Sequence, residues 1–145
     1  MKKYLFIAIA AMCSIFFACA DNDRIITFDQ IPETAKATVQ KYLGSENIAF
    51  VKLDDELFGD KYEVRFMDGK EMVFEKDGEL RKVDYQFEAV PDELVPATVR
   101  EQINASFPNT FIVEWGKDDW GWKAELNNKL DVKFSRDLQL KGLDD

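Results

Sequence analysis

The sequence contains no histidine, and its two cysteines, Cys13 and Cys19, both lie among the first 20 residues. Without histidine the protein has no imidazole to act as a general base near neutral pH or as a nitrogen ligand of zinc or copper. Without cysteine after residue 19, the rest of the chain has no thiol nucleophile and cannot form a disulfide. These absences exclude most hydrolase mechanisms and the ordinary zinc and copper sites.

Sequence patterns that support other kinds of catalysis are also missing. The seven glycines are scattered singly, so the chain has no glycine-rich loop for a phosphate group. None of Ser45, Ser106 and Ser135 lies in a nucleophile-elbow or Ser-x-x-Lys pattern. With 28 acidic residues, neighbouring carboxylates are expected by chance, and no pair is distinguished from the others. We predict that the protein is not an enzyme and needs no cofactor; an enzyme built on two facing carboxylates is the remaining catalytic alternative.

The N-terminus has the three-part layout of a signal peptide. Lys2 and Lys3 precede an apolar stretch from Tyr4 to Phe17, and small residues follow at Ala18 and Ala20. The apolar stretch spans about 14 residues, fewer than the roughly 20 that a membrane-spanning helix needs. The pattern predicts export to the periplasm, with residues 1–20 as the signal peptide and no membrane span.

Two processing routes fit this N-terminus. The small residues Ala18 and Ala20 favour cleavage after Ala20, which releases a soluble periplasmic protein. Cys19 is followed by a polar, acidic tether, which favours lipidation at Cys19 and an outer-membrane-anchored lipoprotein. Phe16 and Phe17 argue against lipidation, because lipoprotein signals usually carry leucine and a small residue there. We slightly favour simple cleavage.

Acidic residues outnumber basic ones, which limits the choice of partner. The formal net charge is −9, and it becomes −11 when Lys2 and Lys3 leave with a signal peptide. A strongly acidic protein repels polyanions. We therefore expect neither nucleic acid nor anionic lipid as a partner, and expect an unidentified protein or peptide instead.

The chain repeats itself. Residues 62–84 match residues 122–144 at a constant offset of 60 without a gap. Further upstream the offset is 64, where Ile31-Pro32 corresponds to Val95-Pro96, so the copies differ by a four-residue loop change. We predict two tandem units after the signal peptide, joined by a linker: a first unit at 21–84, a second unit at 85–145, and the linker at 85–90.

Each unit is predicted to begin with a helix and to continue as a sheet. Ala35, Val39 and Leu43 recur every four residues, the spacing of one helical stripe, and Val99, Ile103 and Phe107 repeat this pattern. Apolar and charged residues then alternate with period two, which is typical of half-buried strands. The expected fold class is α+β, with each helix packed on a roughly four-stranded antiparallel sheet.

Turn residues separate the predicted strands. Asp68-Gly69 and Asp77-Gly78 are typical of tight hairpin turns, because glycine adopts positive φ without strain. The second unit has Asn128-Lys129 and Asp137-Leu138 at the matching positions. We expect the loss of both glycines to force a different turn type or a longer loop in the second unit.

These residues resemble the PepSY-like proteins exported by Bacteroidetes, which are tandem repeats with a fold like that of β-lactamase inhibitory protein. The resemblance rests on the Ile31-Pro32 and Val95-Pro96 helix leads, on Phe107-Pro108-Asn109, and on the segment from Phe74 to Leu80. It implies helices on one side of a sheet and a non-enzymatic role in binding or restraining other proteins. It also implies calcium binding in some relatives. The second unit departs from the pattern at Asp137-Leu138.

Clustered carboxylates give one candidate metal site. Asp54, Asp55 and Asp60 lie in one predicted loop, and Asp118 and Asp119 lie in its counterpart. Carboxylate oxygens are the ligands that calcium prefers, although neither loop has the spacing of an EF-hand. Aspartate and glycine are also common in solvated turns, which is the simpler interpretation.

A second candidate site is a partner-binding surface. Phe58 and Trp120 lie at predicted loop ends, where an exposed aromatic ring would anchor a protein partner. Trp115 and Trp122 share strand faces with other apolar residues and are predicted to belong to the core. The opposite face of the sheet would present Arg65, Lys123 and Glu125 among other charges. That face is either a docking surface or simply the solvated side of an antiparallel sheet.

Overall fold

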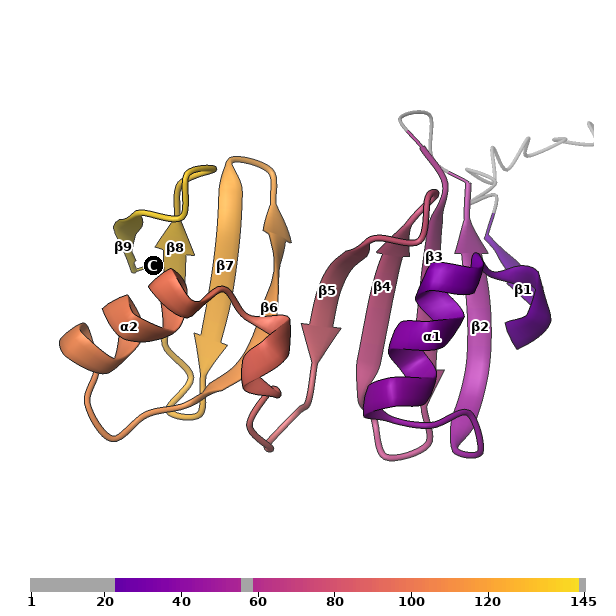
Figure 1. Cartoon of the computed structure of the whole chain (residues 1–145), viewed down its shortest axis with the longest axis horizontal. Coiled ribbons are helices and arrows are strands. Elements are labelled where there is room, and N and C mark those ends of the chain that lie inside the picture. Colours follow the sequence, from indigo (N-terminus) through magenta and orange to yellow (C-terminus); the bar gives the residue numbers. More distant parts are fainter. Residues whose placement is uncertain (1–22, 56–58, 144–145) are drawn as a thin grey trace, which may run out of the picture.

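The computed structural model describes residues 23–55 and 59–143 (Figure 1). Within these ranges the chain forms two α-helices, two short 3-10 helices and nine strands. The helical elements are η1 (Phe28–Gln30), α1 (Glu33–Tyr42), η2 (Asp92–Leu94) and α2 (Ala97–Ser106). The strands are β1 (Arg24–Ile26), β2 (Ile48–Asp54), β3 (Lys61–Phe66), β4 (Glu71–Glu75), β5 (Leu80–Asp84), β6 (Ile112–Asp118), β7 (Gly121–Leu126), β8 (Asp131–Phe134) and β9 (Leu140–Leu143).

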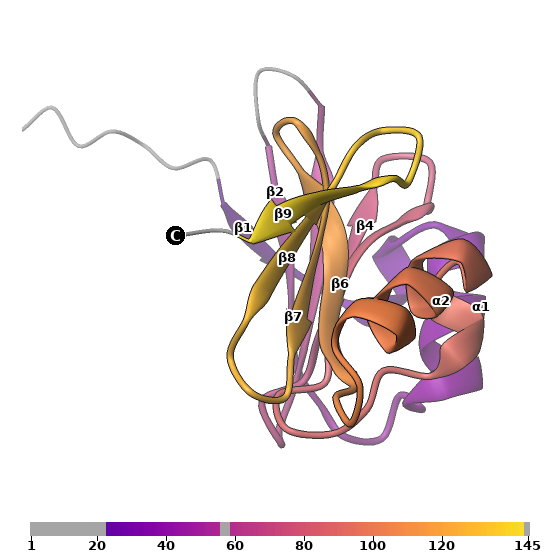
Figure 2. The same ribbon diagram turned by 90° about the vertical axis from the view of Figure 1, so that its left-hand side faces the viewer.

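The described strands form one antiparallel sheet whose spatial order equals their order in the sequence, from β1 to β9. Figure 2 shows α1 and α2 on the same side of this sheet, so its other side carries neither helix. The predicted α+β class is confirmed. Four strands follow each helix in the sequence, but they do not form separate sheets. Strand β5 pairs with β6 through Lys82–Gly116, Val83–Trp115 and Asp84–Glu114, so the sheet continues from one half to the other. The tandem origin of the two halves stays a prediction.

Strand β1 was not predicted. It is only three residues long, too short to show a period-two pattern, and it pairs with β2 in the register Ile25–Lys52. Its partner strand lies beyond helix α1 in the sequence. Only the tertiary fold therefore identifies Arg24–Ile26 as a strand.

The core lies between the sheet and the helices. One register row crosses the sheet in the order Val51, Val64, Met72, Val83, Trp115, Ala124 and Val132, and every member is buried. Ala35 and Val39 of α1 and Val99 and Ile103 of α2 cover this side and are also buried. They belong to one apolar cluster that includes residues of both halves. The helical and strand periodicities of the sequence therefore meet in a shared core.

Each helix is also fixed to the sheet by a polar side chain. Thr34 of α1 donates a hydrogen bond of 3.1 Å to the carbonyl oxygen of Asp77 in the β4–β5 turn. The side chain of Gln102 in α2 donates a hydrogen bond of 2.7 Å to the carbonyl oxygen of Leu138. It also accepts a hydrogen bond of 2.9 Å from the amide of Leu140, and both partners lie in the β8–β9 hairpin. Each helix is thus hydrogen-bonded to the last hairpin of its own half, but through a residue at a different position of the helix.

The expectation of altered hairpins in the second half is wrong. Lys129 and Leu138 adopt φ values of 71° and 61°, in the left-handed region that Gly69 and Gly78 occupy in the first half. The hydrogen bonds are also equivalent: the Lys129 amide donates to Leu126, as that of Gly69 donates to Phe66. The flanking strand pairs fix the turn geometry, and the non-glycine residues accept the left-handed backbone.

Gly78 itself is required by packing. A Cβ atom there would overlap Thr34 Oγ1 and lie 2.9 Å from Pro32 Cβ, because the turn lies against the start of α1.

The predicted linker, residues 85–90, is held in place by hydrogen bonds to the sheet. The amide of Tyr85 donates a hydrogen bond of 2.8 Å to the carbonyl oxygen of Val113 in β6, and the amide of Val90 donates one of 2.8 Å to that of Ile112. The two halves are thus connected by an ordered segment.

Candidate binding surface

The side of the sheet without helices, here called the open face, carries two parallel rows of charge. One row runs from β3 to β8 through Arg65, Glu71, Asp84, Glu114, Glu125 and Asp131. The neighbouring row runs from β2 to β8 through Lys52, Glu63, Val73, Lys82, Gly116, Lys123 and Lys133. Since side chains alternate along a strand, the apolar row toward the helices forces both of these rows onto the open face.

Ion pairs link the two rows. Lys82 Nζ lies 3.4 Å from Glu71 and 3.3 Å from Glu114, and so bridges β4 and β6. Lys123 Nζ lies 3.1 Å from Asp131. The Cα of Gly116 lies beneath the Lys82 side chain, where an added Cβ would come within 2.9 Å of Lys82 Cγ. Glycine at this position therefore lets the lysine cross the sheet.

Glu71 is the most buried carboxylate of the open face, with 6% of its surface exposed. Burial raises the pKa of Glu71, and the neighbouring Lys82 and Arg65 act in the opposite direction. Arg65 pairs with both Glu71 and Glu63. Removing Arg65 would therefore leave a buried carboxylate with fewer cations, which makes this arginine a structural as well as a surface residue.

The predicted open-face residues lie where the sequence placed them, and each is held by a neighbour. Arg65 and Lys123 take part in the ion pairs described above. The Glu125 carboxylate forms an ion pair of 2.9 Å with Lys129, four residues further along the chain. The open face thus presents a fixed charge pattern, which suits either hydration or docking.

Trp120 stands at one end of the sheet, in the turn between β6 and β7, and is 83% exposed. Its neighbours in the sequence behave differently. Trp115 is buried and stacks parallel to the half-buried Trp122, with ring centroids 5.1 Å apart and an interplanar angle of 3°. Trp115 belongs to the core, as predicted, and Trp122 is partly buried and packs against the core. The other predicted anchor, Phe58, lies outside the described residues.

Two hollows lie at the β6–β7 turn. The larger, of about 350 Å³, is lined by Trp120 and Trp122 together with Lys133 and Lys141. The second, of about 220 Å³, is lined by three cations, Arg81, Lys117 and Arg136, and by Asp118 and Asp119. Asp118, Gly121 and Trp122 line both hollows.

Gly121 is required for this arrangement. A Cβ at Gly121 would overlap the carbonyl oxygen of Phe134 and lie 3.0 Å from the carbonyl carbon of Ser135. Both atoms belong to the backbone, which cannot rotate away. Gly121, Arg136 and Lys141 were not predicted as site residues, because they come from different strands and turns and meet only in the folded sheet.

The predicted metal-binding residues lie in two separate places. Asp54 and Asp60 are at the β2–β3 connection and Asp118 and Asp119 are at the β6–β7 turn, with β4 and β5 between the two hairpins. Three strand spacings amount to about 14 Å, so one ion cannot contact both loops. Asp60 pairs with Lys76 at 3.3 Å. In residues 23–55 and 59–143 no group of three or more acidic residues is arranged to hold a metal ion.

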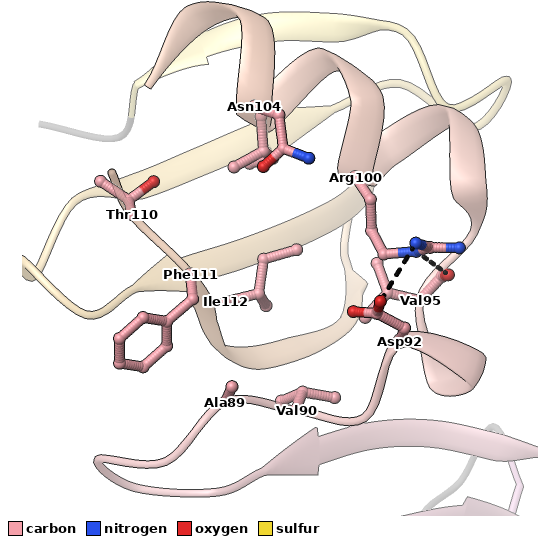
Figure 3. Close-up of a pocket in the computed structure, with 10 residues that line it drawn as sticks. Ala89, Val90, Asp92, Val95, Arg100, Asn104, Thr110, Phe111 and Ile112 are labelled. Atoms are coloured by element: carbon pink, nitrogen blue, oxygen red, sulfur yellow. Dashed lines mark hydrogen bonds and ion pairs between the residues drawn. The ribbon is translucent and has the colours of Figure 1, made fainter. Parts of the chain in front are cut away.

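A further cavity, of about 120 Å³, lies beside α2 (Figure 3). Ala89 and Val90, Ile103 and Ile112 contribute much of its apolar lining. Arg100 closes one side, where it pairs with Asp92 at 3.4 Å and donates to the Val95 carbonyl at 3.3 Å. Its cation is therefore already satisfied within the protein. No sequence pattern predicted this cavity.

None of the helices in the described part of the chain is long and apolar enough to cross a membrane.

Comparison with solved structures finds similar folds. A crystal structure from Bacteroides vulgatus, described as a "putative periplasmic protein" of the DUF2874 family, has a TM-score of 0.80 and 25% identity, covering 87% of this chain and 99% of that one. One from Bacteroides thetaiotaomicron, described as a "putative calcium-regulated periplasmic protein", has a TM-score of 0.77 and 25% identity over the same shares. Another Bacteroides vulgatus structure, a "putative periplasmic protein of unknown function", has a TM-score of 0.77 and 24% identity, covering 85% and 99%.

Comparison with curated protein sequences finds no match. The family model described as "Putative beta-lactamase-inhibitor-like, PepSY-like" matches residues 60–141, more than half of the chain. This segment runs from the start of β3 into β9 and includes α2, so it covers most of the sheet. The chain belongs to this PepSY-like, beta-lactamase-inhibitor-like family.

Proposed function

We propose that this protein is a non-catalytic periplasmic module that binds another protein or a peptide through the open face of its sheet. The observation that carries the proposal is that this face has neither helix on it and yet displays two ordered rows of charge. Trp120, with 83% of its surface exposed, extends the surface at one end. Exposed tryptophan and fixed charge supply affinity and orientation at protein interfaces.

Site-specific photo-crosslinking tests this proposal. A photoreactive residue in place of Lys123, on the open face, is expected to capture a defined partner in a periplasmic extract. The same residue in place of Glu101, exposed on α2, serves as the control on the other side of the molecule. Equal capture of the same protein from both positions, or no capture from Lys123, would contradict the proposal.

We also propose that residues 1–20 direct export and that residues 21–84 and 85–145 are diverged copies of one unit. The similar structures described as periplasmic support export. Intact mass measurement of the protein from a cell envelope distinguishes cleavage after Ala20 from lipidation at Cys19. A lipidated form would retain Cys19 and carry the added mass of its acyl chains, and a Cys19→Ala variant would lose it.

Calcium binding is the second candidate function. It is supported by the 25% identical structure described as calcium-regulated and by the carboxylates Asp54, Asp55 and Asp60 in one loop and Asp118 and Asp119 in the other. A specific ligand stabilises the folded state by mass action. We expect calcium, and not magnesium, to raise the melting temperature. An unchanged melting temperature in millimolar calcium, with no effect of Asp55→Ala and Asp119→Ala, would rule this function out.

A further inference from the structure

We infer that the end of the sheet around Trp120 binds an acidic segment of the partner chain. This inference rests on the proposed function and names the chemistry of the partner. The surface concerned, here called the Trp120 rim, is made of Trp120, Trp122, Arg81, Lys117, Lys133, Arg136 and Lys141.

The charge of the rim is opposite to that of the whole chain. The formal net charge of the protein is −9, but the rim gathers five cations. The acidic residues that line the same hollows are Asp118 and Asp119. Glu75 accepts a hydrogen bond of 3.1 Å from Arg81 and another of 3.1 Å from Lys117, and so compensates part of their charge. The rim still carries a local excess of positive charge on an acidic protein.

Two of the rim cations are available to a ligand. Arg136 and Lys141 are exposed, and neither side chain forms a hydrogen bond or ion pair with another residue of the described ranges. Lys141 lines the larger hollow with Trp120, and Arg136 lines the smaller one. An incoming carboxylate would therefore displace no internal partner, and the arginine fork can hold it through two hydrogen bonds.

The geometry favours a short acidic peptide over a long polyanion. The exposed Trp120 ring supplies an apolar contact beside the cations, a combination enriched at protein interfaces. The adjoining open face carries five acidic residues in one register row, Glu71, Asp84, Glu114, Glu125 and Asp131. These carboxylates already pair with lysines of the neighbouring row, Lys82 with Glu71 and Glu114 and Lys123 with Asp131. A polyanion extending along the sheet would have to compete with them, whereas carboxylates confined to the rim would not.

Fluorescence anisotropy with a labelled hexaglutamate peptide tests the inference, with a hexaglutamine peptide as the uncharged probe. At low salt the protein is expected to bind hexaglutamate at least fivefold more tightly than hexaglutamine. Lys141→Glu and Trp120→Ala are each expected to weaken hexaglutamate binding at least fivefold. Arg24→Glu is the matched control, because Arg24 is an exposed cation on β1 at the opposite edge of the sheet.

Three results would overturn the inference. One is equal binding of both peptides, and another is an equal loss of binding in Lys141→Glu and Arg24→Glu, which would indicate a general charge effect. A third is tighter binding of trigalacturonate than of hexaglutamate, which would indicate an acidic sugar. Unchanged melting temperatures show that the variants are folded. The photoreactive residue at position 123 can also be combined with Lys141→Glu. If the partner is captured equally well with and without Lys141→Glu, the inference fails while the proposed function stands.

Discussion

At the scale of single residues, Lys129 holds a backbone conformation that suits glycine. Its φ of 71° matches the 91° of Gly69 in the other half, and an L-residue in this region costs roughly 1–2 kcal/mol. We predict that Lys129→Gly raises the free energy of unfolding by about 0.5–1 kcal/mol, because glycine gives back part of the gain as backbone entropy. Denaturant unfolding measures the change.

Lys129→Ala is the control for that substitution. It removes the ion pair with Glu125 and the contact of Lys129 Nζ with the Phe87 ring, as glycine does, but it keeps the Cβ that opposes positive φ. A gain of stability in the alanine variant equal to that in the glycine variant would show that backbone strain is not the cause.

Glu75 gives the protein part of its sensitivity to acid. Burial alone would raise the pKa of Glu75, but hydrogen bonds from Lys117 and Arg81 outweigh it and hold the pKa below its ordinary value of 4.5. A carboxyl whose pKa is lowered by folding stabilises the protein above its unfolded pKa and loses that contribution as the pH falls through the folded value.

We therefore predict that Glu75→Gln lowers the free energy of unfolding by about 1 kcal/mol at pH 7. The difference from the parent protein should shrink as the pH falls below 4.5, because the parent carboxyl becomes neutral as well. Urea unfolding at several pH values measures this. A difference that stays constant down to pH 2 would mean that the glutamine disturbs packing and that the charge has no part.

Single residues of the candidate surface were predictable where one strand determines their position. The alternation along β3 and β7 places Arg65, Lys123 and Glu125 on the open face, and the position of Trp120 between Asp118-Asp119 and Gly121 places it at a loop end. Arg136 and Lys141 were not predictable. Their position beside the β6–β7 turn depends on the close contact of Gly121 with Phe134 and Ser135, which no local pattern encodes.

At the scale of secondary-structure elements, Gln102 joins α2 to the β8–β9 hairpin through two hydrogen bonds. We predict that Gln102→Ala lowers the free energy of unfolding by about 2 kcal/mol, since each partly buried hydrogen bond contributes about 1 kcal/mol. Chemical denaturation measures the loss.

Two variants serve as comparisons for Gln102→Ala. Thr34→Val removes the single, more exposed hydrogen bond of α1 and should cost less. Gln102→Glu keeps the acceptor for the Leu140 amide but places a carboxylate oxygen next to the Leu138 carbonyl oxygen, so that two acceptors face each other. This variant should be no more stable than Gln102→Ala. Full stability in Gln102→Ala would show that apolar packing alone positions α2.

Elements with strong periodicity were predicted, and weakly patterned ones were not. The four-residue spacing of Val99 and Ile103 predicted α2, and the alternation of residues 62–74 predicted β3 and β4. Strand β1 escaped because three residues carry no period. The turns of the second half were misjudged because glycine content indicates the conformation that a turn prefers, whereas strand pairing imposes it at Lys129 and Leu138.

At the scale of the whole molecule, one apolar cluster contains residues from both halves, and β5 and β6 join them within one sheet. We predict that the protein unfolds as a single cooperative unit. All three tryptophans, Trp115, Trp120 and Trp122, lie in the second half, so tryptophan fluorescence reports on that half alone. Far-ultraviolet circular dichroism reports on both.

The two melting curves are expected to coincide. A fluorescence transition separated from the dichroism transition by more than the error of either would show that the halves unfold independently. A Gly116→Val variant tests the seam directly, because a branched side chain would collide with Lys82, which pairs with Gly116 across the β5–β6 junction. It should lower both melting temperatures together.

The sequential strand order also governs how the chain can assemble while it emerges N-terminus first from a ribosome or a secretion channel. Each strand from β2 to β9 pairs with the strand that left just before it, so none waits for a distant partner still to be made. Only β1 with β2 and β5 with β6 must close a loop that contains a helix. Such a sheet can grow at one edge, strand by strand, in the direction of synthesis.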